Sequence, residues 1–408
     1  MKKLLSLLAV AALMPVAANA EVLQNVNLKG DIQTIASDVK HDEGSYVRGT
    51  SARVLAGLSA DLVEDVTANL MFQYANIWGS DDSVGKTTQD YLDQVRVVEA
   101  NVVLHNLFCC LEATVGRQFY GDEDSAVIYF GPNHYNAEFN GYVSSVDAAK
   151  ITYGDDVKAL TLIGGRINGL ATAGANGTAF IPTVQATPNF GMGSADFFGA
   201  DFRMNLSDNL KAQVYGYDFR DAFVGPDGNL DSDAGFYGAK LSLDAAVRLS
   251  AEYARNFGGD RLVKEHDATG QMVKVDAATD LEKVTVRGTF YYANENFFAF
   301  GNYTPGLLMG HLFGGQLNGY SLTEGVSLFN LGFDMKPAEK WTVSLDGFSF
   351  QDHRMKHSAT YEADLTAKYA HNEYVELFAG VGYANYAKML GADHRDNVKG
   401  QLGMLIKF

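Results

Sequence analysis

The final eleven residues, 398–408, alternate strictly between an apolar row and a largely polar row. The apolar row is Val398, Gly400, Leu402, Met404, Ile406 and Phe408, and the other row is Lys399, Gln401, Gly403, Leu405 and Lys407. Successive side chains of a β-strand point to opposite faces, so this segment predicts a strand with one face in an apolar medium and the other in water.

The same alternation recurs along most of the chain. Between Tyr361 and Tyr369, an apolar row that starts and ends on tyrosine faces away from a polar row of Thr, Glu, Asp and Lys. A hydrophobic content of 47% is therefore spread over strands, and beyond the N-terminus no segment has the roughly 18 consecutive apolar residues that a spanning helix needs. Such strands predict a membrane-spanning β-sheet with aromatic residues at the interfaces.

The connections predict how many strands there are. Eight short turns are expected near 63–65, 106–109, 155–156, 207–209, 244–245, 294–296, 336–340 and 371–373. Nine longer polar segments are expected at 39–46, 79–90, 119–137, 169–193, 222–233, 257–281, 304–323, 351–357 and 387–395. We therefore predict an all-β fold, a transmembrane antiparallel β-barrel of about 18 strands, closed because an open edge in hydrocarbon would leave backbone groups unpaired. A secreted soluble all-β protein or a solenoid is the alternative.

The N-terminus predicts export. Met1-Lys2-Lys3 forms a basic start, residues 4–13 an apolar stretch, and Ala18-Asn19-Ala20 a small-residue cleavage site. We expect a signal peptide at 1–20 and a single barrel at 21–408.

Two resemblances add detail. A last strand that ends on Phe408 resembles the closing strand of bacterial outer-membrane barrels, which implies recognition by the outer-membrane assembly machinery. A signature of the alginate-export family resembles three stretches of this chain: Val115-Gly116-Arg117-Gln118, Tyr120-Gly121-Asp122-Glu123 and Phe139-Asn140-Gly141. Asn140 stands where that family has Asp. This resemblance implies an eighteen-stranded barrel and an acidic sugar polymer as solute. Alternation places Arg117 on the lipid side, either in the interfacial belt or turned inwards by a bulge.

Alternation also assigns charges to the lumen. The predicted pore-lining cations are Arg53, Arg96, Arg203, Lys211, Lys240, Arg248, Lys283 and Arg287. The last six are expected on five consecutive strands, where they would form a basic wall that favours anions. Alternatively, these cations pair with acids such as Asp201 and Glu252 and only rigidify the barrel.

Several functional classes find no support. A net charge of −17 disfavours nucleic-acid binding. No catalytic constellation, cofactor fingerprint or dedicated metal site stands out, so we expect no enzyme, no cofactor and no metal. The acidic loop at 227–233 is expected to be solvated or to bridge lipopolysaccharide, and the neighbours Cys109 and Cys110 to sit in a tight turn.

Together these patterns predict an outer-membrane channel, a porin that passes small hydrophilic or anionic solutes. Its expected partners are outer-membrane lipid and lipopolysaccharide. The alternative is a structural or adhesive surface barrel whose pore is closed.

The loop at 169–193 is unusually apolar for a loop in water, with Phe180, Ile181 and Phe190. We predict that it folds inwards and narrows the pore. Deleting it should raise single-channel conductance, and unchanged conductance would place the loop outside.

Overall fold

The structure is a computed structural model. It describes residues 23–41, 46–78, 95–108, 110–123, 125–136, 140–141, 143–167, 195–220, 234–258, 269–294, 297, 299–301, 303–308, 325–352, 354, 359–386 and 395–408. The predicted signal peptide at 1–20, the loop at 169–193 and the acidic loop at 227–233 lie outside these residues.

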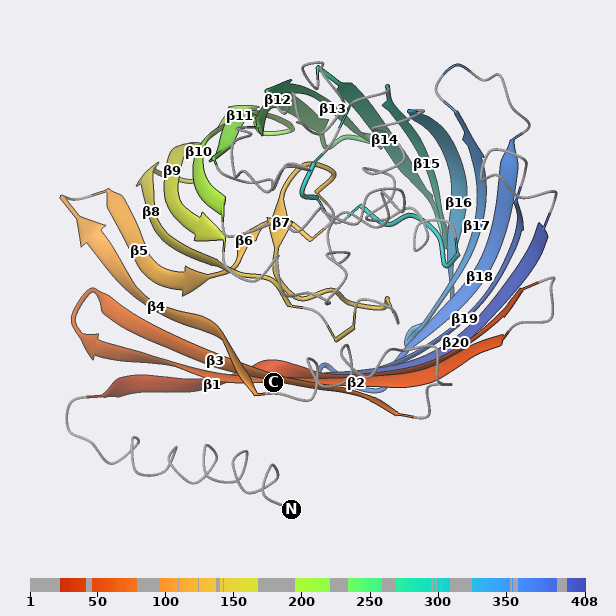
Figure 1. Ribbon diagram of the computed structural model, residues 1–408, viewed down its shortest axis with the longest axis horizontal. Coiled ribbons are helices and arrows are strands. Elements are labelled where there is room, and N and C mark those ends of the chain that lie inside the picture. The colour runs from red at the N-terminus through yellow and green to blue at the C-terminus, as the bar shows by residue number, and fades with distance from the viewer. Residues whose placement is uncertain are drawn as a thin grey trace, which may run out of the picture.

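Eighteen strands form one closed antiparallel barrel, as predicted (Figure 1). Each strand pairs with its neighbours in the chain, and β20 pairs with β1 to close the ring. The strands are β1 (Gln24–His41), β2 (Tyr46–Val63), β3 (Val66–Trp78), β4 (Arg96–Leu107), β5 (Leu111–Gln118), β8 (Val146–Gly154), β9 (Lys158–Ile167), β10 (Ala195–Ser207), β11 (Leu210–Arg220), β12 (Ala234–Leu243), β13 (Val247–Gly258), β14 (Gln271–Leu281), β15 (Val284–Ala293), β16 (Val326–Ala338), β17 (Trp341–Gln351), β18 (Thr360–Ala370), β19 (Val375–Tyr386) and β20 (Arg395–Lys407). Two short strands, β6 (Tyr120–Gly121) and β7 (Tyr129–Phe130), form a separate pair inside the ring.

The predicted alternation sets which face of each strand looks outwards. In β20, Leu402 is 64% exposed on the outer surface, whereas Lys399 and Gln401 are buried on the inner side. In β18, Tyr361 and Leu365 are exposed, and the acids between them are buried. The outer surface is therefore apolar along these strands and the interior is polar.

Short turns gather at one end of the barrel, here called the turn end, and longer connections at the other, the loop end. The tightest turns, such as 64–65 and 282–283, have two residues and contain Asp65 and Glu282 with positive φ. A residue with positive φ allows the chain to reverse direction within a turn of two residues. Cys110 lies in the turn between β4 and β5, as expected, and Cys109 lies outside the described residues.

One strand lies elsewhere than the sequence predicts. The predicted loop at 257–281 contains β14, and the predicted turn at 294–296 belongs to a long connection between β15 and β16. The error arises because β14 is rich in polar residues, while the apolar residues after 296 suggest a strand. Those residues lie inside the barrel instead: Phe297 and Phe300 are buried there. No helix among the described residues is long and apolar enough to cross a membrane.

The outward face generates a prediction about stability. Leu402 lies midway along β20 and faces outwards, so Leu402→Arg should destabilise the barrel in lipid by about 2–4 kcal/mol. Phe108→Arg, in a turn where the side chain is 89% exposed, should cost about 0–1 kcal/mol. Equilibrium unfolding in urea from lipid vesicles measures both, and equal losses would contradict the assigned outer face.

Candidate functional site in the barrel lumen

The chain enters the lumen directly after β5. Gly116 has φ +122°, and a Cβ there would lie 2.3 Å from the carbonyl oxygen of Ala100, so the position requires glycine. Gln118 is buried, and its amide Nε2 donates to the carbonyl oxygens of Gly116 and Ala148. The residues that suggested a family signature thus end β5 and direct the next segment inwards.

Two segments occupy the lumen. The first inner segment comprises the described residues of 119–145, between β5 and β8, and the second those of 297–308, after β15. Figure 1 shows β6 and β7 of the first segment inside the ring of strands. The segments join through hydrogen bonds from Tyr129 N to Phe300 O (3.0 Å) and from Phe300 N to Val127 O (2.8 Å).

An apolar cluster fixes both segments to the barrel wall. Val127, Ile128 and Phe130 of the first segment are buried with wall residues of β10 to β12. The ring centroids of Phe219 and Phe300 lie 4.5 Å apart. A lumen of eighteen strands is wide enough for an aqueous channel, but here part of it holds a hydrophobic core.

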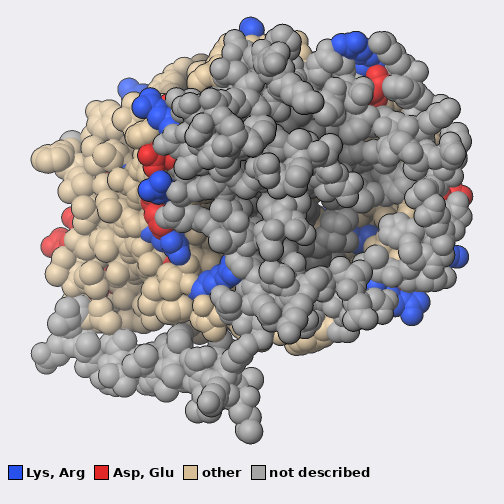
Figure 2. Space-filling view, viewed as in Figure 1, with Lys and Arg blue, Asp and Glu red and all other residues tan. Residues whose placement is uncertain are grey.

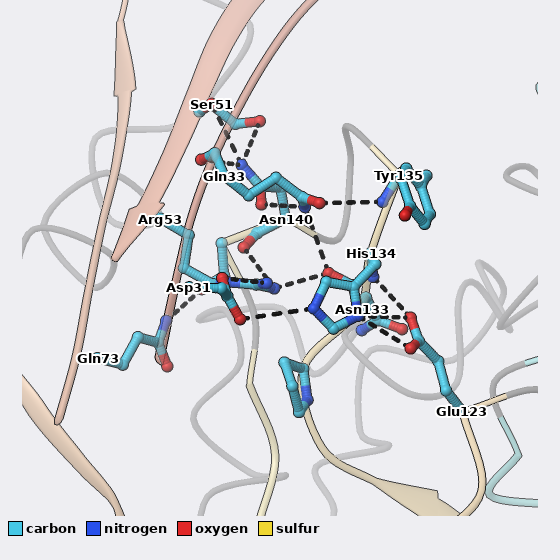
Figure 3. Close-up of polar contacts among 12 residues, drawn as sticks. Asp31, Gln33, Ser51, Arg53, Gln73, Glu123, Asn133, His134, Tyr135 and Asn140 are labelled. Carbon is cyan, nitrogen blue, oxygen red and sulfur yellow. Dashed lines mark hydrogen bonds and ion pairs between the residues drawn. The ribbon is translucent and has the colours of Figure 1, made fainter. Parts of the chain in front are cut away.

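A polar network fixes the first inner segment to β1 and β2 on the other side (Figure 3). Arg53 donates through Nη1 to the carbonyl oxygen of Asn133 (2.6 Å) and through Nη2 to Asp31 Oδ1 (2.9 Å). Gln33 Nε2 donates to Asn140 Oδ1, and the Asn140 amide donates to Ser51 Oγ. These side chains come from strands far away in sequence, so the network ties the inserted chain to the barrel.

His134 joins two carboxylates at the centre of this network. Its Nε2 lies 3.5 Å from Asp31 Oδ2, and its Nδ1 lies 2.9 Å from Glu123 Oε2 (Figure 3). Burial and the nearby Arg53 oppose protonation, but the two carboxylates outweigh them and raise the pKa of His134 above its ordinary value. The same contact lowers the pKa of Glu123, although burial acts in the opposite direction.

Two polar cavities lie beside the inner segments. The Tyr217 cavity, of about 450 Å³, lies between the first segment and the wall, and its charged lining is Asp122, Lys150, Asp201, Arg203, Lys240 and Glu252. The Tyr303 cavity, of about 330 Å³, touches both segments, and its charged lining is Arg287, Asp346, Asp364, Lys368 and Lys399 with His134. Tyrosines complete both linings, so each cavity offers charges of both signs next to aromatic faces.

The predicted pore-lining cations fall into different places. Arg53 faces inwards, but the first inner segment covers it, so it anchors that segment rather than facing open water. Arg96 begins β4 opposite Gln73. Lys283 lies in the turn between β14 and β15, outside the wall that was expected to include it. The others lie on the inner side of separate strands: Arg203 on β10, Lys211 on β11, Lys240 on β12, Arg248 on β13 and Arg287 on β15.

Besides Arg53, which pairs with Asp31, three more of the predicted arginines form ion pairs. Arg203 pairs with Asp201 (3.1 Å) and Asp122 (3.6 Å). Arg248 pairs with Asp280 (2.5 Å). Arg287 contacts both Asp334 (2.9 Å) and Asp346 (2.6 Å). Each of these three guanidinium groups therefore has a carboxylate partner in the structure.

Sequence reasoning missed Asp276, Asp280 and Asp334 as inward acids. Asp276 and Asp280 lie on β14, which the sequence assigns to a loop, and Thr289 donates to Asp276. The signal was present, because 272–280 alternates Met, Lys, Asp, Ala and Asp against a row dominated by small apolar residues. No group of three His, Cys, Asp or Glu able to hold a metal occurs among the residues searched, those that the structure describes.

Known structures resemble this barrel. OccAB1 of Acinetobacter baumannii is 11% identical with a TM-score of 0.63, over 96% of this chain and 99% of that one. Pseudomonas aeruginosa OpdL is 10% identical with a TM-score of 0.63, over 94% and 99%. The outer membrane protein OprD from Pseudomonas aeruginosa is 11% identical with a TM-score of 0.60, over 96% and 97%.

These likenesses establish the fold and nothing finer. No family model matches the sequence, and no curated protein matches it. The resemblance to the alginate-export family finds no support in these comparisons, whereas the eighteen-stranded barrel does.

The contacts of His134 predict a pH dependence. Because its pKa is raised, its stabilising contacts are complete below the ordinary pKa of about 6.5 and are lost as the pH rises through the raised value. Without these contacts the first inner segment is held less firmly, so conductance fluctuations should increase between pH 6 and pH 9. His134→Gln, which lacks the imidazolium, should show the high-pH level of fluctuation at every pH. His105→Gln is the control, because His105 pairs with Glu112 outside the inner segments. Identical pH profiles for native protein and His134→Gln would contradict this account.

Proposed function

We propose that this protein is an outer-membrane channel for small hydrophilic solutes. The observation that carries the proposal is a closed barrel with an apolar outer face and a lumen that contains polar cavities. Backbone groups in hydrocarbon must be paired, and a closed barrel pairs them with no free edge. A polar interior in such a barrel is the arrangement of a solute pathway.

The outer membrane is the proposed location. Exposed leucines, valines and aromatic residues cover the outer face, and the similar structure of OprD is described as an outer membrane protein. Phe408 lies at the seam, where its backbone exchanges hydrogen bonds with Gly30 (2.8 and 3.1 Å). We also propose that the chain is exported through a cleaved signal peptide at 1–20. The outer-membrane assembly machinery would then recognise Phe408.

The cavities support a small solute rather than a polymer. Volumes of about 330 and 450 Å³ lie in the range that binds small molecules. The inner segments, which are joined to each other and to the wall, occupy part of the lumen beside these cavities. An acidic sugar polymer, which the alginate-export resemblance implied, would require these segments to move aside.

The lining charges support a weak preference for anions. The Tyr217 cavity has three cations and three carboxylates, and the Tyr303 cavity has three Lys or Arg and two carboxylates. Lys150 and Lys240 have no ion pair with a described residue, whereas Asp201 and Glu252 accept hydrogen bonds from Gln213 and Tyr215. The ammonium groups are therefore the charges most available to a passing solute.

The competing function is a surface barrel with a closed pore. The apolar cluster of the inner segments and strands β10 to β12 favours it, because packed apolar side chains fill part of the lumen. Conduction distinguishes the two functions.

Planar bilayers test the channel. We expect single-channel currents and a reversal potential that indicates a weak anion preference under a KCl gradient. Lys150→Gln with Lys240→Gln should shift that potential towards cations, and Lys336→Gln with Lys340→Gln, at the exposed turn end, should leave it unchanged. A correctly folded but silent barrel would favour the closed-pore function, and a strongly cation-selective native pore would contradict the proposed preference.

A further inference from the structure

A row of charged residues crosses the outer surface near the loop end. Arg117 of β5 is the register partner of Asp147 on β8, which is the partner of Arg166 on β9. Arg166 is in turn the partner of Asp196 on β10, and Asp196 that of Arg220 on β11. Charge thus alternates in sign across five neighbouring strands.

These side chains share the outer face with the apolar wall. On each of the five strands, a residue an even number of positions away is exposed on the outer surface. These are Val115, Ile151, Leu162, Phe198 and Val214. Arg117, which the sequence places either in the interfacial belt or inside the barrel, lies on the outer side, two residues from the exposed Val115. There it contacts Asp147 through Nε (2.7 Å) and Nη2 (2.8 Å).

The row of charges continues beside and beyond Arg220. Asp218 lies two residues before Arg220, pairs with it (2.9 Å) and shares its face. Two strands further on, Arg255 of β13 is exposed beside the outward Tyr237 and has no ion pair with a described residue. We call Arg117, Asp147, Arg166, Asp196, Asp218, Arg220 and Arg255 the outer charge belt. Figure 2 shows basic and acidic side chains alternating along the boundary between the tan wall and the grey residues.

The guanidinium groups of Arg166 and Arg220 are about half-exposed, so a ligand outside the barrel can reach them. Arg166 reaches Asp196 only through Nε, at 3.6 Å, and its side chain is 53% exposed. The side chain of Arg220 is 59% exposed and also lies over the ring of Phe198, 5.4 Å from its centroid. The guanidinium of Arg117 also donates to the carbonyl oxygen of Val97. Those of Arg166 and Arg220 are held by a carboxylate but remain exposed on the outer surface.

Charge on the lipid side of a barrel is costly in the hydrocarbon and nearly free at the interface. A belt at the loop end therefore marks the level of the lipid headgroups. Guanidinium groups bind phosphate through paired hydrogen bonds, and regularly spaced guanidiniums suit a ligand with several phosphates. The carboxylates between the arginines hold the guanidinium groups in place and reduce the electrostatic repulsion between them.

We propose that the outer charge belt binds the phosphate groups of lipid A, the phosphorylated anchor of lipopolysaccharide, mainly through Arg166, Arg220 and Arg255. This inference rests on the proposed outer-membrane location. It assigns the belt a lipid ligand that is separate from the lumen and its solutes.

The test uses the folded full barrel in neutral detergent and measures binding by native mass spectrometry. The probes are lipid A with two phosphates and the same lipid with both phosphates removed. The belt variant is Arg166→Gln, Arg220→Gln, Arg255→Gln. The control is Lys158→Gln, Lys336→Gln, Lys340→Gln, which removes the same charge from exposed positions at the turn end.

We expect the native barrel and the control to bind the phosphorylated lipid equally, and the belt variant to bind at least about tenfold more weakly. Equal binding by all three proteins, or equal binding of the two lipids, would overturn the proposal and leave the belt as structural ion pairs. Should the triple variant not fold, Arg255→Gln alone, which breaks no ion pair among described residues, should weaken binding by about threefold, and unchanged binding would overturn the proposal. Conductance of each protein is recorded separately, so a failure of the channel function is distinguished from a failure of lipid binding.

Discussion

The pairing of backbone groups at the seam between β1 and β20 is the constraint on which this structure depends. In hydrocarbon, an unpaired N–H or carbonyl group has no water to bind, so a sheet of this kind is stable only when its first and last strands meet. The register from Asp31 opposite Lys407 to His41 opposite Asn397 satisfies that demand. Closure then separates an outer face from a lumen, and the inward side chains of the strands line that lumen.

The lumen is organised by two kinds of contact with the inner segments. Aromatic rings of β10 to β12 hold the segments on one side, and Arg53, Gln33 and Asn140 hold the first segment through hydrogen bonds on the other. The apolar contact does not depend on pH, whereas the polar one includes His134 between two carboxylates. Polar cavities remain between these anchors. Their arginines are paired, whereas Lys150 and Lys240 form no ion pair with a described residue, which is why we infer a selective but weakly charged pathway.

Local pattern predicts the barrel well because alternation is a property of neighbouring residues. It predicts the strand number, the outward row of β18 and the inward Lys399 of β20. The local pattern fails where an apolar segment packs inside the lumen. The residues after 296 are as apolar as a strand, yet Phe300 packs against the inner wall. The contacts of Arg53 with Asn133 and of Gln33 with Asn140 join residues 80 and 107 positions apart, and no local pattern signals them. The pairing of Arg287 with Asp334 also depends on a strand register that only the fold defines.

The most direct test of a channel for small hydrophilic solutes is the size limit for uptake into liposomes that contain the purified barrel. Swelling rates would be compared for a series of neutral solutes from amino acids and monosaccharides to long oligosaccharides. We expect rapid swelling with the smallest solutes and a sharp decline for oligosaccharides, because the inner segments leave cavities of about 330 and 450 Å³. Equal uptake of small and polymeric solutes, or no uptake of any solute by folded protein, would contradict it.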